Sequence, residues 1–404
     1  MRERVSYEMA RALAAGAVTP VGEEQIALED CAGRVLAREL LAAADVPAFD
    51  RSAYDGYAFR AEDAEQAAAD RPVVLRVTQE IPAGGMPRGE VRPGTAAKVL
   101  TGAPIPPGAD AVVKYEDTRF TADRVELPRP ARPGQNIVRA GEDVRAGAVL
   151  AQAGSLIDPG LAGTLAAQGL GQVWVRRVPQ VGLLSTGSEL VEAGEPLEPG
   201  KIYNSGRHAL AAAIQALGCR PVWLGRAEDG VEAIRERLED GLERCDALVV
   251  TGGASRGSYD LTPAAMERAG AELLFRGVDF KPGMACAYAV GRGKLICGLS
   301  GNPAAALTNF HLAAAPALKK LAGRRDHLPR EATVALAAPF PKASPMVRML
   351  RGRLALERGR LELELSGGQG NVVLSTAAGC DMLAVVPAGS GPLSAGTELR
   401  GILI

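Results

Sequence analysis

The sequence predicts a multidomain protein of mixed α/β and β class, and three observations lead to this prediction. Residues 173–325 alternate short apolar runs with amphipathic stretches, which is typical of a doubly wound α/β domain with a parallel sheet. Residues 45–135 combine many prolines and glycines with short β-type runs, which indicates an inserted β-rich module. Residues 326–404 contain alternating runs separated by Gly359, which predicts a hairpin within a C-terminal β domain of barrel or sandwich type.

The segments that flank the inserted module complete a first domain, made of residues 1–44 and 136–172. Residues 1–44 are rich in alanine and leucine and show a helical apolar rhythm through Ile26, Leu28, Val35, Leu36 and Leu40. We therefore expect this segment to be helical. Farther along, Asp158-Pro159-Gly160 predicts the start of a helix that ends at Gly169.

Within residues 173–325 the strands are expected at 181–184, 222–224, 247–250, about 271–276 and about 294–297. Ser205 is expected to cap a helix that runs to Leu217. Asp229 and Glu232 have the spacing of a capping box for the next helix, and Thr262-Pro263 suits the start of another. A last helix is expected from about 304 to 321.

The composition excludes several classes of partner. The 404 residues carry a formal net charge of −1 and only 4% aromatic residues, so neither nucleic acid nor an anionic membrane is an expected partner. No apolar run at the N-terminus resembles a signal peptide, and none elsewhere is long enough to span a bilayer. The six cysteines form no CxxC pair, which favours a reduced cytoplasmic protein.

Two loops of the β-rich module stand out as functional candidates. The segment 52–58 places Asp55 between two tyrosines and beside a glycine, and the segment 101–110 is a Pro/Gly loop with Thr101 at its head. Proline lowers the entropy cost of ordering such a loop, and binding residues are often held on rigid loops. We therefore interpret Asp55 and Thr101 as site residues.

Polar residues and glycines follow the predicted strands of residues 173–325, where open α/β sheets bind their ligands. Glycine allows a close approach of backbone N–H groups to an anion, and a helix N-terminus adds a favourable charge. Each turn alone is explained by a tight βα connection, but several at one sheet edge favour a phosphate or oxyanion site. No GxGxxG, GxxxxGK[ST], GxSxG or HExxH motif is present. The predicted substrate-binding residues are Ser185, Thr186, Gly187, Thr251, Gly252, Gly253, Lys281, Gly301, Asn302 and Pro303.

Several carboxylates lie beside glycines or hydroxyls in the predicted loops, namely Asp55, Asp143, Glu189, Asp229 and Asp260. Such a setting suits Mg²⁺, which takes one or two carboxylates together with substrate phosphate and water. A helix-capping role alone also explains Asp229, and a turn carboxylate alone explains Asp143 equally well. The predicted metal ligands are Asp55, Asp143 and Asp229.

In order along the chain, these motifs resemble those of the MoeA/gephyrin-E family, the molybdopterin molybdenumtransferases. The resemblance covers nearly the whole chain, through the loops around Asp55 and Thr101 and the segments 132–137, 141–143, 185–190, 251–261, 281–283 and 301–303. It implies an elongated homodimer of four-domain subunits, whose active cleft lies between the α/β domain of one subunit and the β-rich module of the other. It also implies Mg²⁺-dependent insertion of molybdate or tungstate into adenylylated molybdopterin, with release of AMP.

On that resemblance, the catalytic residues are Asp55, Thr101, Glu189, Asp229 and Asp260, with Lys281 and Pro303 at further functional positions. Expected partners are the preceding adenylyltransferase and apo-molybdoenzymes. The chain departs from the family pattern, which has acids where Ser188 and Ser258 stand, a lysine at Met284 and a proline at Ser300. Arg51 and Arg256 also replace smaller or neutral residues. These departures keep a non-catalytic pterin-binding or delivery protein open as an alternative, and a scaffold protein as a third.

Overall fold

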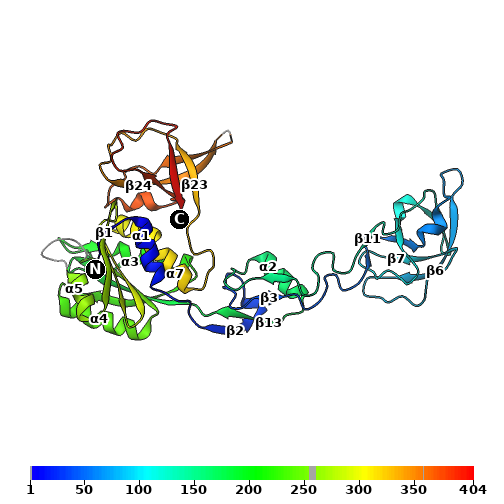
Figure 1. Cartoon of the computed structure of the whole chain (residues 1–404), viewed down its shortest axis with the longest axis horizontal. Coiled ribbons are helices and arrows are strands. Elements are labelled where there is room, and N and C mark those ends of the chain that lie inside the picture. The colour runs from blue at the N-terminus through cyan, green and yellow to red at the C-terminus, as the bar shows by residue number, and fades with distance from the viewer. Residues whose placement is uncertain (1, 254–260, 358) are drawn as a thin grey trace. The chain divides into compact units, whose positions relative to one another are not determined.

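The computed structural model describes residues 2–253, 261–357 and 359–404, and it forms two compact units (Figure 1). The first unit consists of Met1–Arg38, Ala153–Asp158 and Gln172–Ile404. The second consists of Glu39–Gln152 and Pro159–Gly171. The chain therefore leaves the first unit after Arg38 and returns to it for residues 153–158. It leaves again for residues 159–171 and returns at Gln172.

A seven-stranded sheet in the order β1-β19-β21-β22-β18-β14-β17 forms the centre of the first unit. Its strands are β1 (Arg2–Val5), β14 (Gln180–Thr186), β17 (Arg220–Ala227), β18 (Ala247–Thr251), β19 (Glu272–Val278), β21 (Ala287–Gly291) and β22 (Lys294–Leu299). The sheet is mixed rather than wholly parallel, because β21 runs antiparallel to both of its neighbours. Arg292 and Gly293 have positive φ at the turn between β21 and β22, as a tight hairpin requires.

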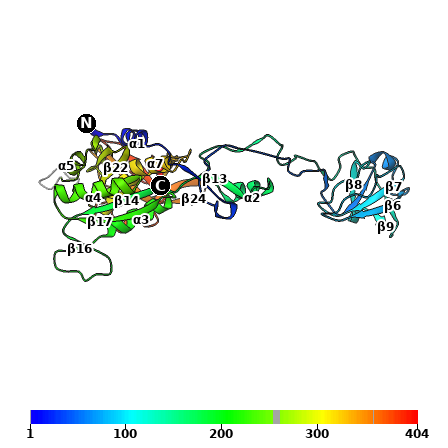
Figure 2. The same ribbon diagram turned by 90° about the horizontal axis from the view of Figure 1, so that it is seen from below.

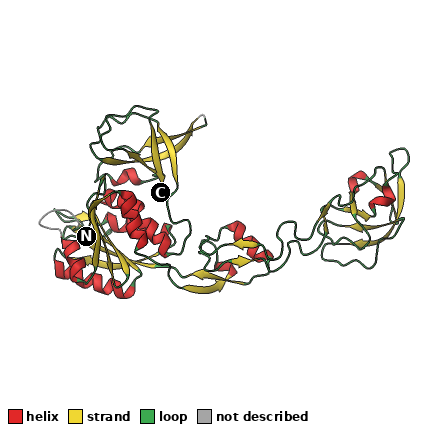
Figure 3. Cartoon of the chain, viewed as in Figure 1, coloured by secondary structure: helices red, strands yellow, loops and turns green. Residues whose placement is uncertain are grey.

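Helices cover both faces of this sheet, as a doubly wound fold requires (Figures 1 and 3). Leu183 and Val249 face one apolar cluster, whereas Leu184 and Val250, their neighbours along the strands, face another. The first cluster contains residues of α1 (Tyr7–Gly16), α3 (Ser205–Ala216), α6 (Pro303–Asn309) and α7 (Ala315–Leu321). The second contains residues of α4 (Val231–Arg244) and α5 (Leu261–Arg268).

The predicted helical segment 1–44 is α-helical only at α1, and a single 3-10 turn follows at Leu28–Asp30. Residues 2–5 form β1, which pairs with β19. Farther along, β2 (Glu23–Ala27) pairs with β13 (Gln172–Arg176), and Val35 and Leu36 form bridges with Leu156 and Val175. The prediction of a helix over the rest of this segment was wrong because its apolar residues find strand partners far away in the sequence, which a local apolar rhythm does not reveal.

Four details of the α/β domain also differ from the prediction. Asn204, not Ser205, caps α3, because its side chain accepts a hydrogen bond from the amide of Arg207. The helix α5 begins at Leu261, one residue before the expected cap Thr262. Between the last two expected strands lies β21, which the sequence analysis did not predict. The last helix is interrupted by a π-helical turn at Phe310–Ala314.

The C-terminal region of the first unit is a closed barrel of five strands. Its strands are β23 (Glu331–Leu336), β24 (Val347–Glu357), β25 (Arg360–Leu365), β26 (Met382–Val386) and β27 (Glu398–Leu403). The order β24-β25-β23-β27-β26 closes through pairing of β24 with β26. The predicted hairpin around Gly359 is confirmed as β24 and β25. A short strand, β20 (Phe280–Lys281), joins the same sheet beside β24.

The second unit contains a six-stranded sheet in the order β8-β5-β7-β6-β10-β9, part of which is visible in Figure 2. These strands are β5 (Gly56–Phe59), β6 (Val73–Ile81), β7 (Thr95–Val99), β8 (Ala111–Lys114), β9 (Arg119–Phe120) and β10 (Arg124–Leu127). Short ladders join β4 (Arg51–Ser52) to β11 (Ile137–Val138) and β3 (Leu40–Leu41) to β12 (Val149–Ala151). The predicted helix near residue 160 is α2 (Pro159–Ala167).

All six cysteines are free thiols, and five of them are buried. Burial raises the pKa of the Cys219 and Cys286 thiols to about 12, so both remain protonated and unreactive near neutral pH. Among the described residues, no helix is both long and apolar enough to cross a membrane.

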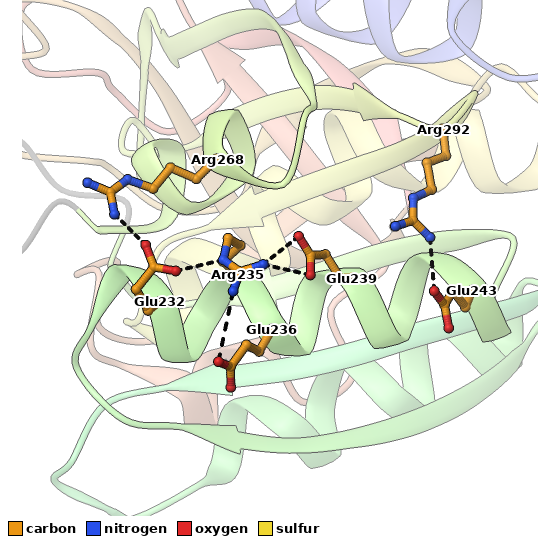
Figure 4. A network of polar contacts seen from close by, with 7 residues as sticks. All are labelled: Glu232, Arg235, Glu236, Glu239, Glu243, Arg268 and Arg292. Atoms are coloured by element: carbon orange, nitrogen blue, oxygen red, sulfur yellow. Dashed lines mark hydrogen bonds and ion pairs between the residues drawn. The ribbon is translucent and has the colours of Figure 1, made fainter.

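Ion pairs connect α4 to its neighbours along its exposed face (Figure 4). Arg235 contacts Glu232, Glu236 and Glu239 of the same helix. Arg268 of α5 pairs with Glu232, and Arg292 of the β21–β22 turn pairs with Glu243 at 3.2 Å. Exposed ion pairs are individually weak, so packing of Ile234, Leu238 and Leu242 is what mainly holds α4 in place.

The imidazole of His311, in the π-helical turn, gives a test of core packing. Burial, followed by the charge of Lys319, lowers the pKa of His311 from 6.5 to about 4. The folded protein holds this ring neutral. The contribution of the ring to stability is therefore complete above pH 6.5 and is lost as the pH falls towards 4. On acidification the wild type should lose at most about 3 kcal/mol of its free energy of unfolding through this ring, an upper bound because the ring keeps some solvent access. We expect His311→Gln to abolish this part of the loss.

Denaturant unfolding of both proteins near neutral pH and in mild acid would measure this difference. The variant isolates the imidazole from the carboxylates, which titrate in the same acid range. An equal loss of stability in the two proteins would contradict the assignment of a buried neutral ring.

Candidate functional site

A large pocket lies where β14, β18 and β22 end at their carboxyl termini. It encloses about 1030 Å³. Its wall contains the turns 186–190, 251–253 and 300–303, the segment 283–285 with Lys281, and Asp229. The structure therefore brings together the predicted residues Thr186, Gly187, Glu189, Asp229, Thr251, Gly252, Gly253, Lys281, Gly301, Asn302 and Pro303 in one wall.

The turn after β18 requires glycine at two successive positions. Gly252 has φ +94°, and a Cβ atom there would lie 2.4 Å from Thr186 Oγ1. Gly253 has φ +62°, and a Cβ atom there would lie 2.7 Å from Thr262 Oγ1. Both glycines therefore let the turn lie close to the end of β14 and to α5, so that its backbone borders the pocket.

A buried network of hydroxyl and amide groups supports the strand ends. Ser185 is not among the residues that line the pocket: it is fully buried and receives hydrogen bonds from Asn204 Nδ2 at 3.1 Å and Thr251 Oγ1 at 3.3 Å. Thr186 Oγ1 donates to the carbonyl of Thr251 at 3.2 Å. These bonds hold β14 and β18 together below the pocket, so the expected role of Ser185 as an anion donor remains a prediction.

The carboxylate of Asp229 does not form the predicted capping box. Gly230 occupies the N-cap position of α4 and makes no side-chain capping bond, whereas Asp229 Oδ2 accepts a hydrogen bond from the amide of Ser188 at 3.0 Å. Asp229 therefore connects the turn after β17 to the turn after β14. Glu189 follows Ser188 in the turn after β14, and its carboxylate folds back over Gly187.

Lys281 and Gly283 are positioned by two different elements. Lys281 belongs to β20 and pairs with Arg348 of the barrel. Gly283 has φ +108° and packs against α6, where Asn309 Nδ2 donates to its carbonyl at 2.9 Å. Of the described residues that line the pocket, Glu189 and Asp229 are acidic and only Lys281 is basic.

The sequence analysis missed two parts of the pocket wall. One is the barrel loop with Asn371, Val372 and Leu374. Arg351 is almost fully buried behind it and donates to the carbonyls of Gly368 and Gly370. The other is formed by Ile202 and Tyr203, which are 55% and 45% exposed. These two residues form β16 (Ile202–Tyr203). The loop between β15 (Leu190–Val191) and β16 projects from the sheet (Figure 2). The glycine-rich run 367–370 was a signal for the first.

The two candidate loops of the second unit are joined to each other. Asp55 Oδ1 accepts hydrogen bonds from the amide of Thr101 at 2.7 Å and from its hydroxyl at 2.8 Å. The backbones of the two loops are also joined, because the Ser52 amide donates to the Ala103 carbonyl and the Gly102 amide donates to the Ser52 carbonyl. The Thr101 amide and hydroxyl lower the pKa of the exposed Asp55 carboxyl. Asp55 and Thr101 are thus in direct contact, and their role in a site remains a prediction.

Two further predictions on metal ligands and acids have different outcomes. Asp143 is exposed in the same unit, in a turn where its amide donates to the carbonyl of Val46. Asp260, together with Arg256 and Ser258, lies outside the described residues. Within residues 2–253, 261–357 and 359–404, no three histidine, cysteine or acidic side chains gather as a metal cage. Two carboxylates in one wall suit Mg²⁺ only when substrate phosphate and water complete its shell.

Three family models match the chain. They are the MoeA N-terminal region (domain I and II) at residues 5–169, a probable molybdopterin binding domain at residues 182–320, and the MoeA C-terminal region (domain IV) at residues 333–404. Together they cover the inserted module, the α/β domain and the barrel.

Two relatives and one solved structure extend this match over the whole chain. The molybdopterin molybdenumtransferase of Bacillus subtilis is 35% identical over 385 residues, which cover 94% of this chain and 90% of the relative. That of Staphylococcus aureus strain Mu50 is 33% identical over 378 residues, with the same coverage. The molybdopterin biosynthesis MoeA protein of Pyrococcus horikoshii OT3 is 31% identical, with a TM-score of 0.85 over 99% of this chain and 100% of its own.

These matches and the closed terminal barrel confirm the predicted fold class. They also confirm the resemblance that the sequence motifs indicated. The chain therefore belongs to the MoeA family, the molybdopterin molybdenumtransferases.

Proposed function

We propose that this protein inserts molybdate, or tungstate, into adenylylated molybdopterin and releases AMP. The observation that supports this most directly is the pocket of about 1030 Å³ at the strand ends, in a chain whose relatives are molybdopterin molybdenumtransferases. Its glycine turns, hydroxyls and lysine suit a ligand with several phosphate or oxyanion groups. Its size also accommodates a pterin and a nucleotide together.

In this proposal, each part of the wall has a role in holding the substrate. The backbone of Thr251, Gly252 and Gly253 binds phosphate oxygens, and Lys281 balances their charge. Asn302 and Pro303 place the positive end of α6 at the same wall. Thr186 and Ser185 keep the turns in place from below. Glu189 and Asp229 orient the scissile phosphoanhydride and the water or oxyanion that reacts with it.

A divalent metal fits this proposal as part of the substrate complex. Asp229 would hold Mg²⁺ together with substrate phosphate, and Asp55 and Asp143 of the other subunit of a dimer would be its further ligands. When bound, the ion would neutralise phosphate charge. The carboxylates must be ionised for this purpose, and the lowered pKa of Asp55 agrees with that requirement.

We further propose a homodimer in the cytoplasm, in which Asp55 and Thr101 of one subunit complete the pocket of the other. The six free thiols agree with a reducing compartment. The proposed domains remain 1–44 with 136–172, then 45–135, 173–325 and 326–404. The preceding adenylyltransferase would deliver the substrate, and apo-molybdoenzymes would receive the product.

A second candidate function is that of a non-catalytic protein that binds or delivers the pterin. It is favoured by three residues of the pocket wall, Ser188, Met284 and Ser300, which stand where the family pattern has an acid, a lysine and a proline. Loss of an acid and an ammonium from one wall weakens both metal binding and charge neutralisation. In this case the protein would bind the pterin in the pocket but would not catalyse insertion of the oxyanion.

The two functions are separated by release of AMP from adenylylated molybdopterin in the presence of molybdate, tungstate or neither. We expect release that depends on the oxyanion and on Mg²⁺, and the preferred oxyanion identifies the substrate. Omission of Mg²⁺ with added chelator is the matched control. Tight binding of the pterin without oxyanion-dependent release of AMP would establish the second candidate instead.

A further inference from the structure

The wall of the large pocket has less positive charge than its proposed ligand requires. Glu189 and Asp229 contribute two negative charges, and Lys281 contributes the only positive charge among the described lining residues. A ligand with several phosphate groups would add more negative charge to this wall. Because like charges repel in a partly desolvated site, a further protein cation beside the wall would strengthen binding of such a ligand, in addition to the proposed Mg²⁺.

Three described cations contact the wall from outside. Lys201 donates to the carbonyl of Ser188 and Arg226 to that of Leu190, whereas the guanidinium of Arg4, on the edge strand β1, donates to a sulfur. Its NH2 group lies 3.8 Å from the Sδ atom of Met284, which lines the pocket. A thioether is a weak acceptor, so this contact leaves the donors of the guanidinium available. Among the described residues, Arg4 has no carboxylate within ion-pair distance, whereas Arg400 and Arg235 are paired with several.

The backbone of Arg4 is held in a conformation that is costly for arginine. Its φ is +51°, one of three positive values outside glycine among the described residues. Gly277 beside it on β19 also has a positive φ, of +79°, and a Cβ atom there would lie at an ordinary contact distance of 3.7 Å from Cγ of Arg4. The next residue, Val278, donates its amide to the carbonyl of Met284 at 3.1 Å. Strain of this kind persists where the surrounding structure imposes it, and it is concentrated at ligand sites.

We propose that Arg4 is the second cation of the pocket and contacts phosphate or oxyanion groups of the ligand on the Met284 side. This inference rests on the proposed function, because it takes the ligand to be polyanionic. The planar guanidinium suits such groups, since it donates two parallel hydrogen bonds to one phosphate. The positive charge that Met284 does not supply is thus brought to the pocket by the N-terminal strand.

Calorimetric binding of AMP and of adenylylated molybdopterin to the full-length protein tests the proposal. We expect Arg4→Gln to weaken binding about five- to tenfold at low salt, and the difference to shrink in high salt because screening weakens charge contacts. Arg2→Gln is the matched control. Arg2 lies on the same strand and also donates to a methionine sulfur, at 3.4 Å, but that sulfur belongs to Met9, outside the pocket wall.

Two further variants separate binding from folding. Arg4→Gly relieves the strained backbone, so its melting temperature should be unchanged or higher although its binding is weakened. Adding Met284→Lys to Arg4→Gln should recover affinity, because the new ammonium lies on the same side of the pocket. If the wild type binds neither probe, the proposed function fails. If the wild type binds both probes and Arg4→Gln binds them equally well, Arg4 is not a ligand contact.

Discussion

Gly252→Ala should abolish turnover while leaving most of the protein folded. The new methyl group would lie 2.4 Å from Thr186 Oγ1 and 2.6 Å from the Thr186 carbonyl, at a φ of +94° that disfavours any side chain. The strained backbone costs about 1–3 kcal/mol. Because the turn must also move away from β14, its amides lose their position at the pocket. A displacement of about 1 Å in such a site reduces the rate about 100-fold or more.

Gly218→Ala is the matched control for this result. Gly218 has a similar positive φ, of +79°, but a Cβ atom there would meet nothing within 4 Å. Both variants therefore suffer the backbone penalty, and only Gly252→Ala disturbs the pocket. Thermal unfolding and AMP release of the two proteins would be compared. If both variants lost activity equally, general destabilisation rather than the turn after β18 would explain the effect.

Asp55→Asn should remove most of the activity with little change in melting temperature. Asparagine keeps an oxygen that accepts the two hydrogen bonds from Thr101, so the loop contact survives. It removes the negative charge, which metal binding or proton transfer at the proposed site requires. Asp55→Ala, which loses the acceptor as well, should in addition lower the melting temperature. Full activity of Asp55→Asn would exclude a role for the charge.

Co-expression of an Asp55→Asn subunit with a Glu189→Gln subunit tests whether the second unit acts across a dimer. If each site takes Asp55 from one subunit and Glu189 from the other, a mixed dimer has one intact site of two. Random pairing makes half of the dimers mixed, so about a quarter of wild-type activity should return. Activity no higher than that of either variant alone would place both residues in one subunit.

The sequence predicted the central elements of the fold because their signals are local. The strands β14 and β18 are continuous apolar runs bounded by polar turns, and Gly359 marks its hairpin directly. The short polar strand β1 gives no such signal, since the sheet position beside β19 determines its structure. The segment Glu23–Ala27 was wrongly predicted to be helical for a related reason, because its partner β13 follows more than a hundred residues later.

For the site, sequence reasoning identified groups but not always their partners. The carboxyl ends of strands in one sheet meet at one edge, so the turns after β14, β18 and β22 gathered as expected. The role of Asp229 was misread, because a capping pattern within one helix is visible in the sequence, whereas a bond to the amide of Ser188 is not. Val372 and Leu374 were missed because they belong to a loop of the barrel. The sequence reasoning considered only residues that follow strands of the α/β sheet.

The pairing of β20 with β24 has a consequence for recombination between related proteins. Lys281 is separated by about fifty residues from the start of the barrel, yet its backbone belongs to the barrel's sheet. A chimera that exchanged only residues after 330 would therefore retain the lysine but replace the strand on which it is aligned. In such a hybrid, β20 would come from one protein and its partner β24 from the other. Exchange of residues 280–281 together with the barrel would keep the ladder intact.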